Sequence, residues 1–230
     1  MEVVHMSFIS YLINGISLGS VYALIALGYT MVYGIAKMLN FAHGDVIMVG
    51  AFITYTMCST MGLSPVIGVL AAVVACTLLG MAIEKVAYKP LRKAASPLAV
   101  LITAIGVSYL LQNLATYITG GIARAYPDIP FLTQVMQVGS LNVKRITIIT
   151  PILTILLVVV LVILIQKTKI GMAMRAVSRD FETAQLMGIK INSVISVTFV
   201  IGSLLAGVAS ILYFSNYGQV SPMIGAMPGL

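Results

Sequence analysis

The chain has 230 residues, of which 60% are hydrophobic and 8% are charged, with a net charge of +7 and a mean hydropathy of +1.08. Soluble domains carry about one-quarter charged residues, so this composition excludes an ordinary soluble fold and indicates a chain that lies in lipid. The basic residues fall between hydrophobic runs instead of forming an aromatic-rich patch. This arrangement argues against a nucleic-acid partner and fits the positive-inside rule.

The first apolar run, residues 8–36, contains no charged residue and predicts a membrane span rather than a cleavable signal peptide. As a helix it would measure about 43 Å against a hydrocarbon core of about 30 Å, so it must tilt, break or leave the membrane. Gly28 and Gly34 suggest that the helix loosens before the chain turns back. Gly15 and Gly19 have a spacing that lets helices approach closely, although ordinary bundle packing explains them as well.

The second run, residues 41–60, follows Asn40, which is a plausible N-cap. His43 and Asp45 stand near the membrane edge or inside the bundle. Ionisable groups at such depth are costly and usually face protein or a water-filled path. Two interpretations stay open, namely a capped helix start at the interface and a part of the translocation path.

The third run, residues 66–83, ends in a basic segment that marks a cytoplasmic loop. Glu84 and Lys85 are expected to form a solvated pair there. The fourth run, residues 97–119, contains Gln112 and Asn113, whose amides suit substrate binding or hydrogen bonding between helices.

Residues 120–145 predict a connection outside the membrane, with either a short hairpin or a surface helix. The aliphatic run at residues 146–165 is the clearest single span in the sequence. The last run, residues 194–213, presents a face of small residues, made by Gly202, Ser203, Ala206 and Gly207.

Residues 171–193 form a polar loop between the last two runs. Ser178 or Asp180 can cap a short helix, Glu182 would lie in its favourable first turn, and Gly188 offers a stop after about two turns. The pattern therefore predicts a brief amphipathic helix parallel to the membrane face.

Ala184 and Gly188 stand four residues apart in this loop, and a partner could approach the backbone closely at such a small-residue notch. Spans must alternate across the membrane, and the basic residues give their orientation. Ten of the 13 basic residues fall in three loops that are expected to be cytoplasmic, at Lys37, at residues 85–93 and at residues 167–190. The amino terminus is then outside.

Several catalytic signatures are missing. The sequence has no P-loop, no His-Glu-x-x-His, no Gly-x-Ser-x-Gly and no cluster of ligands at metal spacing. Cys58 and Cys76 lie in separate apolar runs and fit neither a disulfide framework nor a metal site. An enzyme is poorly supported, no cofactor or metal is implied, and transport is the better interpretation.

Three motifs resemble those of a known family. Residues 182–188 fit the E-A-A-x-x-x-G signature of ABC importer permeases, with Thr183 in place of the middle alanine. Residues 28–45 and 171–180 closely resemble LivH-type permeases of branched-chain amino-acid ABC transporters. The I-x-L-P ending of the general signature is absent, as is usual in this branch.

The resemblance implies an all-α polytopic membrane protein of about six transmembrane helices, with residues 1–230 as one permease domain and residues 171–193 as its cytoplasmic coupling loop. The resemblance also implies a location in a bacterial or archaeal cell membrane, among lipid. The expected partners are a second permease subunit, two cytoplasmic ATP-binding subunits and an external solute-binding protein. Family members continue through further spans, so the chain is expected to be truncated after Leu230.

Two groups of candidate residues follow. Those expected to contact the ATP-binding subunits are Arg175, Arg179, Asp180, Glu182, Ala184 and Gly188. Those expected to line the path of a small-molecule substrate are Asn40, His43, Asp45, Gln112 and Asn113. The alternatives are a urea or short-amide permease of the same superfamily, a lone channel or secondary carrier, and a purely structural membrane subunit.

Overall fold

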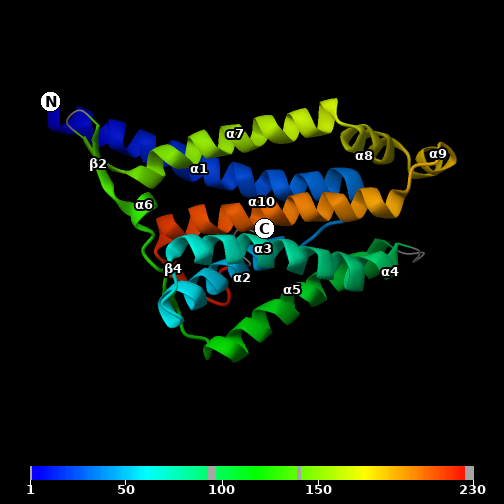
Figure 1. Ribbon diagram of the computed structural model, residues 1–230, viewed down its shortest axis with the longest axis horizontal. Coiled ribbons are helices and arrows are strands. Elements are labelled where there is room, and N and C mark those ends of the chain that lie inside the picture. Colours follow the sequence, from blue (N-terminus) through cyan, green and yellow to red (C-terminus); the bar gives the residue numbers. More distant parts are fainter. Residues whose placement is uncertain (1, 93–96, 139–140, 226–230) are drawn as a thin grey trace.

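Long helices lying side by side make up the molecule, in a computed structural model that describes residues 2–92, 97–138 and 141–225 (Figure 1). The long helices are α1 (Glu2–Ala36), α3 (Pro65–Ile83), α5 (Pro97–Thr119), α7 (Arg145–Lys167) and α10 (Ile191–Tyr217). A π-helical turn, η2 (Glu84–Tyr88), and the short α4 (Lys89–Leu91) continue α3. Within the described ranges, five helical segments are long and apolar enough to cross a membrane. The expected all-α polytopic fold is confirmed.

The second apolar run forms a shorter helix at the centre of the bundle. α2 (His43–Tyr55) is followed by a π-helical turn, η1 (Thr56–Thr60). α2 has 13 residues and η1 adds five. Most side chains of α2 are buried, and it packs against α3 and α10. α2 is therefore an internal element, which explains why the count of lipid-spanning helices is lower than the expected six.

α10 is the central helix, with α1 on one side and α3 on the other (Figure 1). It approaches α1 closely at Gly28 and Gly202, because a Cβ atom at either glycine would lie 3.2 Å from the carbonyl oxygen of the other. Such small residues are what allow membrane helices to pack without a hydrophobic driving force. The small-residue face expected on the last run is thus an internal packing surface.

The end of α1 differs from the expectation. The helix runs unbroken to Ala36, so the predicted loosening at Gly28 and Gly34 is wrong. Lys37 ends the helix with a φ of 56°. Gly15 and Gly19 have no neighbour within 4 Å of a built Cβ atom, so no close helix approach at these two Cβ positions requires glycine.

Short strands and one small helix gather at the end of the bundle that holds the amino terminus (Figure 1). β2 (Val135–Val138) and β3 (Leu141–Lys144) pair antiparallel, with Val135 opposite Lys144. β1 (Arg124–Ala125) pairs antiparallel with β4 (Gln219–Val220). α6 (Pro130–Thr133) lies between β1 and β2. The connection at residues 120–145 thus contains both a hairpin and a short helix, the two forms that its sequence allowed.

The opposite end of the bundle carries α8 (Lys169–Arg179) and α9 (Phe181–Leu186) (Figure 1). The polar loop is therefore two helices, not one. α8 buries Gly171, Met174 and Val177, a spacing of three that gives the helix one apolar face. That spacing is visible in the sequence, as is Thr168, whose side chain accepts a hydrogen bond from the Gly171 N–H at 3.0 Å.

Candidate translocation site and coupling loop

Asp45 is a carboxyl group at 0% exposure inside the bundle. Its Oδ2 accepts a hydrogen bond from Ser108 Oγ at 2.5 Å, and its Oδ1 accepts one from Gln112 Nε2 at 3.0 Å. Gln112 Nε2 also lies 3.0 Å from Ser108 Oγ. These three residues, which we name the α2–α5 polar site, join α2 to α5. The structure thus brings together two of the expected path residues and adds Ser108, which stands one turn before Gln112.

In the described part of the chain, no basic side chain forms an ion pair with this carboxyl group. The ion pair found there joins Glu84 and Arg92. Asp45 is held by neutral donors alone. Gly225 packs directly against it, since a Cβ atom there would lie 2.6 Å from Asp45 Oδ1. A buried acidic group with only neutral partners is costly, which makes it a candidate for a functional site.

His43 is buried, at 2% exposure, but it faces away from Asp45. Two residues correspond to about 200° of helix rotation, so the side chains leave opposite sides of α2. The His43 ring lies edge-on to Tyr29 of α1, with centroids 6.2 Å apart, and its Nε2 has no hydrogen-bond partner in the described part of the chain. His43 and Asp45 therefore do not form a pair.

Asn40 and Asn113 lie apart from the α2–α5 polar site. Asn40 is not the N-cap of α2, because that position is Ala42 and no side chain caps the helix. Instead, the Tyr88 hydroxyl lies 3.1 Å from Asn40 Oδ1. Asn113 is exposed, and its Nδ2 donates to the carbonyl oxygen of Tyr109 in its own helix at 2.7 Å.

Asp180 is the N-cap of α9, as predicted. Its Oδ1 accepts hydrogen bonds from the backbone N–H groups of Glu182 at 2.9 Å and Thr183 at 3.3 Å, and its Oδ2 accepts one from the Thr183 hydroxyl at 2.5 Å. The Thr183 hydroxyl, with the backbone donors, lowers the pKa of the Asp180 carboxyl. Glu182 lies in the first turn, where a negative charge favours the helix dipole.

Gly188 terminates the loop helix with a φ of +81°. The Gly188 N–H donates to Gln185 O and the Ile189 N–H donates to Ala184 O, both at 3.0 Å. These two bonds form a Schellman motif, which favours glycine at the left-handed position. The expected stop at Gly188 is confirmed.

The prediction that Ala184 and Gly188 form a notch open to a partner is wrong. Ala184 is only 3% exposed and belongs to the hydrophobic core of this chain. Gly188 lies beyond the end of α9, in open space. The exposed apolar side chains are instead Leu186, at 87% exposure, and Met187, at 79%. The sequence pattern did not distinguish the inward face of this short helix from its outward face.

Arg175 and Arg179 are both exposed, but they differ in their contacts. Arg175 Nη1 donates to the carbonyl oxygen of Ile165 at 2.7 Å, so it helps to cap the end of α7. Arg179 is in the last turn of α8. Of the two arginines, Arg179 is the one left to reach an acidic partner.

The expected solvated pair of Glu84 and Lys85 is wrong. Glu84 is 4% exposed and forms an ion pair with Arg92. The Ser196 hydroxyl donates to Glu84 Oε2 at 3.0 Å. Arg92 follows Glu84 by eight residues, whereas Ser196 comes from α10, so periodicity along one helix cannot reveal it.

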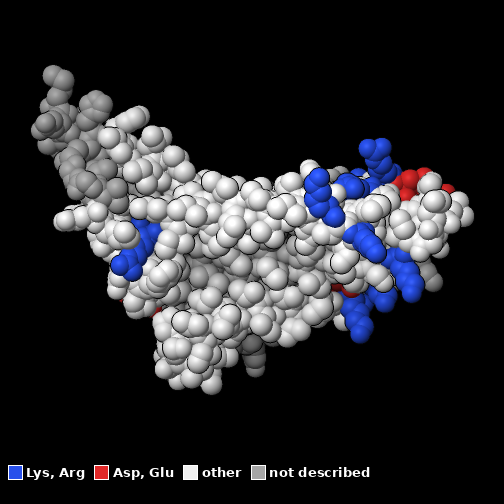
Figure 2. Space-filling view, turned by 45° about the horizontal axis from the view of Figure 1, so that its top comes forward, with Lys and Arg blue, Asp and Glu red and all other residues white. Residues whose placement is uncertain are grey.

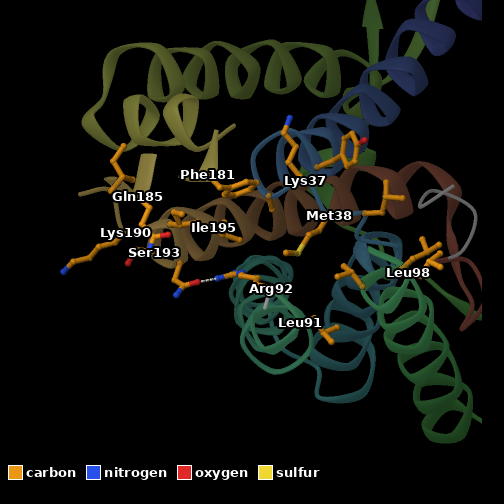
Figure 3. Close-up of a pocket in the computed structure, with 18 of the residues that line it drawn as sticks. Lys37, Met38, Leu91, Arg92, Leu98, Phe181, Gln185, Lys190, Ser193 and Ile195 are labelled. Atoms are coloured by element: carbon orange, nitrogen blue, oxygen red, sulfur yellow. Dashed lines mark hydrogen bonds between the residues drawn. The ribbon is translucent and has the colours of Figure 1, made fainter. Parts of the chain in front are cut away.

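A groove with a volume of about 1170 Å³ opens beside this ion pair (Figure 3). Its walls come from residues 37–39, α4, the start of α5, α9 and residues 188–195. Lys37, Arg92 and Lys190 line it, and no acidic side chain does so in the described part of the chain. Most basic side chains in view gather at this end of the molecule (Figure 2).

Comparisons with known proteins identify the family. A family model described as "Branched-chain amino acid transport system / permease component" matches residues 11–230. The high-affinity branched-chain amino acid transport system permease protein BraD of Pseudomonas aeruginosa is 39% identical over 240 residues, covering 100% of this chain and 77% of that protein.

Other relatives extend the match. The high-affinity branched-chain amino acid transport system permease protein LivH of Escherichia coli is 37% identical over 234 residues, covering 97% of this chain and 76% of that protein. The probable branched-chain amino acid transport permease protein LivH of Methanocaldococcus jannaschii is 27% identical over 197 residues, covering 81% of this chain and 60% of that protein. No solved structure matches the chain. The chain belongs to the permease component family of branched-chain amino acid transport systems.

Proposed function

We propose that this chain is a permease subunit of an ABC importer that carries branched-chain amino acids across a bacterial or archaeal cell membrane. The observation that carries the proposal is the 39% identity to a permease named for that transport, over 100% of this chain. The helical body supports it, because long apolar helices pack against the short α2, which carries the buried Asp45. ATP hydrolysis takes place in separate subunits.

The distribution of positive charge supports an orientation with the amino terminus outside. Basic side chains gather at the end that holds α8 and α9, whereas fewer appear at the opposite end (Figure 2). The bundle end with β2 and α6 carries Arg124, Lys144 and Arg145. Basic residues favour the cytoplasmic side, which supports a cytoplasmic position for α8 and α9.

α9 is the part proposed to dock on a cytoplasmic ATP-binding subunit. Leu186 and Met187 would insert into an apolar groove of that partner, since both side chains are exposed while Ala184 is buried. Arg179 and Glu182 add charge around this apolar tip. The Asp180 cap and the Schellman motif keep the tip in a fixed shape, so that little ordering is needed on binding.

The α2–α5 polar site is the proposed polar element of the substrate path. A branched-chain amino acid carries an ammonium group and a carboxylate beside an apolar side chain. Asp45 offers a carboxylate for the ammonium group, and Ser108 and Gln112 keep its oxygens oriented. Two-state rocking of the helices, driven by closure of the ATP-binding subunits, would expose this site to one side at a time.

The remaining partners complete the proposed assembly. A second permease subunit would share the path, and an external solute-binding protein would deliver substrate at the end with the β-hairpin. The mostly apolar outer faces of α5 and α7 suit lipid or a second permease, with Ile102 at 68% exposure and Ile155 at 64%.

The test is transport by the chain assembled with its ATP-binding subunits, a second permease and a solute-binding protein in proteoliposomes. We expect leucine uptake that requires both ATP and the binding protein. Uptake without nucleotide by the chain alone would instead identify a lone carrier. ATP-driven uptake of urea or a short amide, with none of leucine, would assign a different cargo.

A further inference from the structure

Three polar side chains lie along one side of the helical run formed by α3, η2 and α4. Glu84, Tyr88 and Arg92 follow one another at intervals of four residues, which places them on one helix face. Glu84 is 4% exposed and Tyr88 is 0% exposed, and the Arg92 side chain is 10% exposed. Buried polar groups require partners, so the partners of this row determine where it sits.

The first set of partners belongs to the start of α10. Arg92 Nη1 donates to Asn192 Oδ1 at 2.7 Å, the dashed line in Figure 3, and Ser196 Oγ donates to Glu84 Oε2 at 3.0 Å. Asn192 and Ser196 are again four residues apart. The row is therefore attached to the first turns of α10, just after the connector at residues 187–190 that follows α9.

The second set of partners belongs to the segment that leads into α2. The Tyr88 hydroxyl lies 3.1 Å from Asn40 Oδ1 and 3.2 Å from Leu39 O, so it can donate to either. The His43 N–H then donates to Asn40 O at 3.1 Å. Asp45 follows two residues later. One face of one helical run thus touches both the end of the coupling loop and the start of the helix that carries Asp45.

A groove lies beside the Arg92 end of this row. The groove of about 1170 Å³ lies between α9 and residues 37–39, with Arg92 in its wall (Figure 3). Tyr88 lies in a π-helical turn, a rare geometry that often marks functional sites. Arg92 and Asn192 line the groove, whereas Glu84 and Tyr88 are buried beside it, so these polar contacts link the α9–α10 connector to the start of α2.

We propose that Glu84, Tyr88 and Arg92 are positioning residues that transmit displacement of the coupling loop to the start of α2, and thereby to Asp45. This inference rests on the proposed function as an ATP-driven permease. The ion pair of Glu84 and Arg92 holds α10, and the Tyr88 hydroxyl holds Asn40. Neither group touches substrate.

The test measures coupling in the assembled transporter, as leucine taken up per ATP hydrolysed, together with recovery of the ATP-binding subunit. Tyr88→Phe removes only the hydroxyl, and Arg92→Gln removes the charge. We expect each variant to assemble and hydrolyse ATP at the normal rate while uptake per ATP falls at least about fivefold. Because the row acts as a unit, uptake per ATP in the double variant should be no lower than in the more affected single variant.

Two controls make the result specific. Tyr117→Phe changes a hydroxyl on α5 at 86% exposure, and Lys89→Gln removes a neighbouring exposed charge; both should keep the normal ratio. Normal ratios for Tyr88→Phe and Arg92→Gln, or a parallel fall of uptake and hydrolysis, would overturn the inference. Absence of ATP-dependent uptake in the unmodified assembly would instead refute the proposed function.

Discussion

A hydrogen bond of 3.0 Å joins Asp45 of α2 to Gln112 of α5, two residues that lie 67 positions apart in the sequence. Ser108, on the same face of α5 as Gln112, binds the other carboxyl oxygen at 2.5 Å. α5 is otherwise the least buried of the five apolar helices. This polar contact therefore joins α5 to α2.

Substitution of Asp45 tests the proposed path. Asp45→Asn keeps the shape but removes the charge that would meet a substrate ammonium group, so uptake should fall at least about tenfold, the loss of one charge-assisted hydrogen bond. Asn113→Ala is the matched control, because Asn113 is exposed and bonded within its own helix. The measurement is leucine uptake at equal protein abundance. If Asp45→Asn and His43→Ala both left uptake unchanged, neither residue would belong to the path.

The crossing of α1 and α10 predicts that alanine destabilises the fold at Gly202 but not at Gly15. Gly202→Ala would place a methyl group 2.9 Å from Val32 and 3.2 Å from Gly28 O, and overpacking of this kind costs about 1–3 kcal/mol. Gly15→Ala meets no atom within 4 Å, and alanine favours a helix by about 1 kcal/mol over glycine. Thermal unfolding in detergent should show a lower midpoint for Gly202→Ala only. Equal midpoints for the two variants would contradict the observed crossing.

The comparison of sequence with structure separates local from non-local features. The apolar runs, the Asp180 cap and the Gly188 stop depend on neighbouring residues, and each was predictable. Ser196, which binds Glu84, and the partners of Asp45 come from other helices, and no pattern within one run identifies them. Asn40 shows the same limit, because the local cap that its position suggested is replaced by a contact with Tyr88, which follows 48 positions later.

Because Asp180 caps α9, we expect the stability of α9 to depend on the residue at position 180 and on pH. Asp180→Ala removes the cap, so the amides of α9 should exchange with solvent faster and recovery of the ATP-binding subunit should fall, whereas Asp180→Asn retains a capping oxygen. The pKa of Asp180 is lowered by the Thr183 hydroxyl and backbone donors. Its contribution is therefore complete above the unfolded pKa and is lost as the pH falls through the folded one. Hydrogen exchange that is identical in the three proteins would contradict the capping role.

The exposed tip of α9 predicts where the ATP-binding subunit docks. Leu186→Ser and Met187→Ser remove apolar side chains at 87% and 79% exposure, so the isolated chain should keep its stability while co-purification of the partner falls. Gln185→Ser is the control, since this neighbouring side chain is exposed and already polar. Bulky residues at Ala184 or Gly188 should also reduce co-purification, but through overpacking or backbone strain that lowers the unfolding midpoint. Full recovery of the partner with both serine variants would place its docking surface elsewhere.

The orientation of the bundle can be tested by labelling single cysteines in intact cells. Gln185→Cys on α9 and Gln137→Cys on β2 are both exposed positions, and they lie at opposite ends of the molecule (Figure 1). With the basic end inside, a reagent that cannot cross the membrane should reach residue 137 and not residue 185 until the cells are opened. The same test at Ser178, on α8, should agree with residue 185. Labelling of residue 185 from outside would put α9 on the wrong side for a cytoplasmic ATP-binding subunit, and both the coupling role of the loop and the transmission through Tyr88 would have to be abandoned.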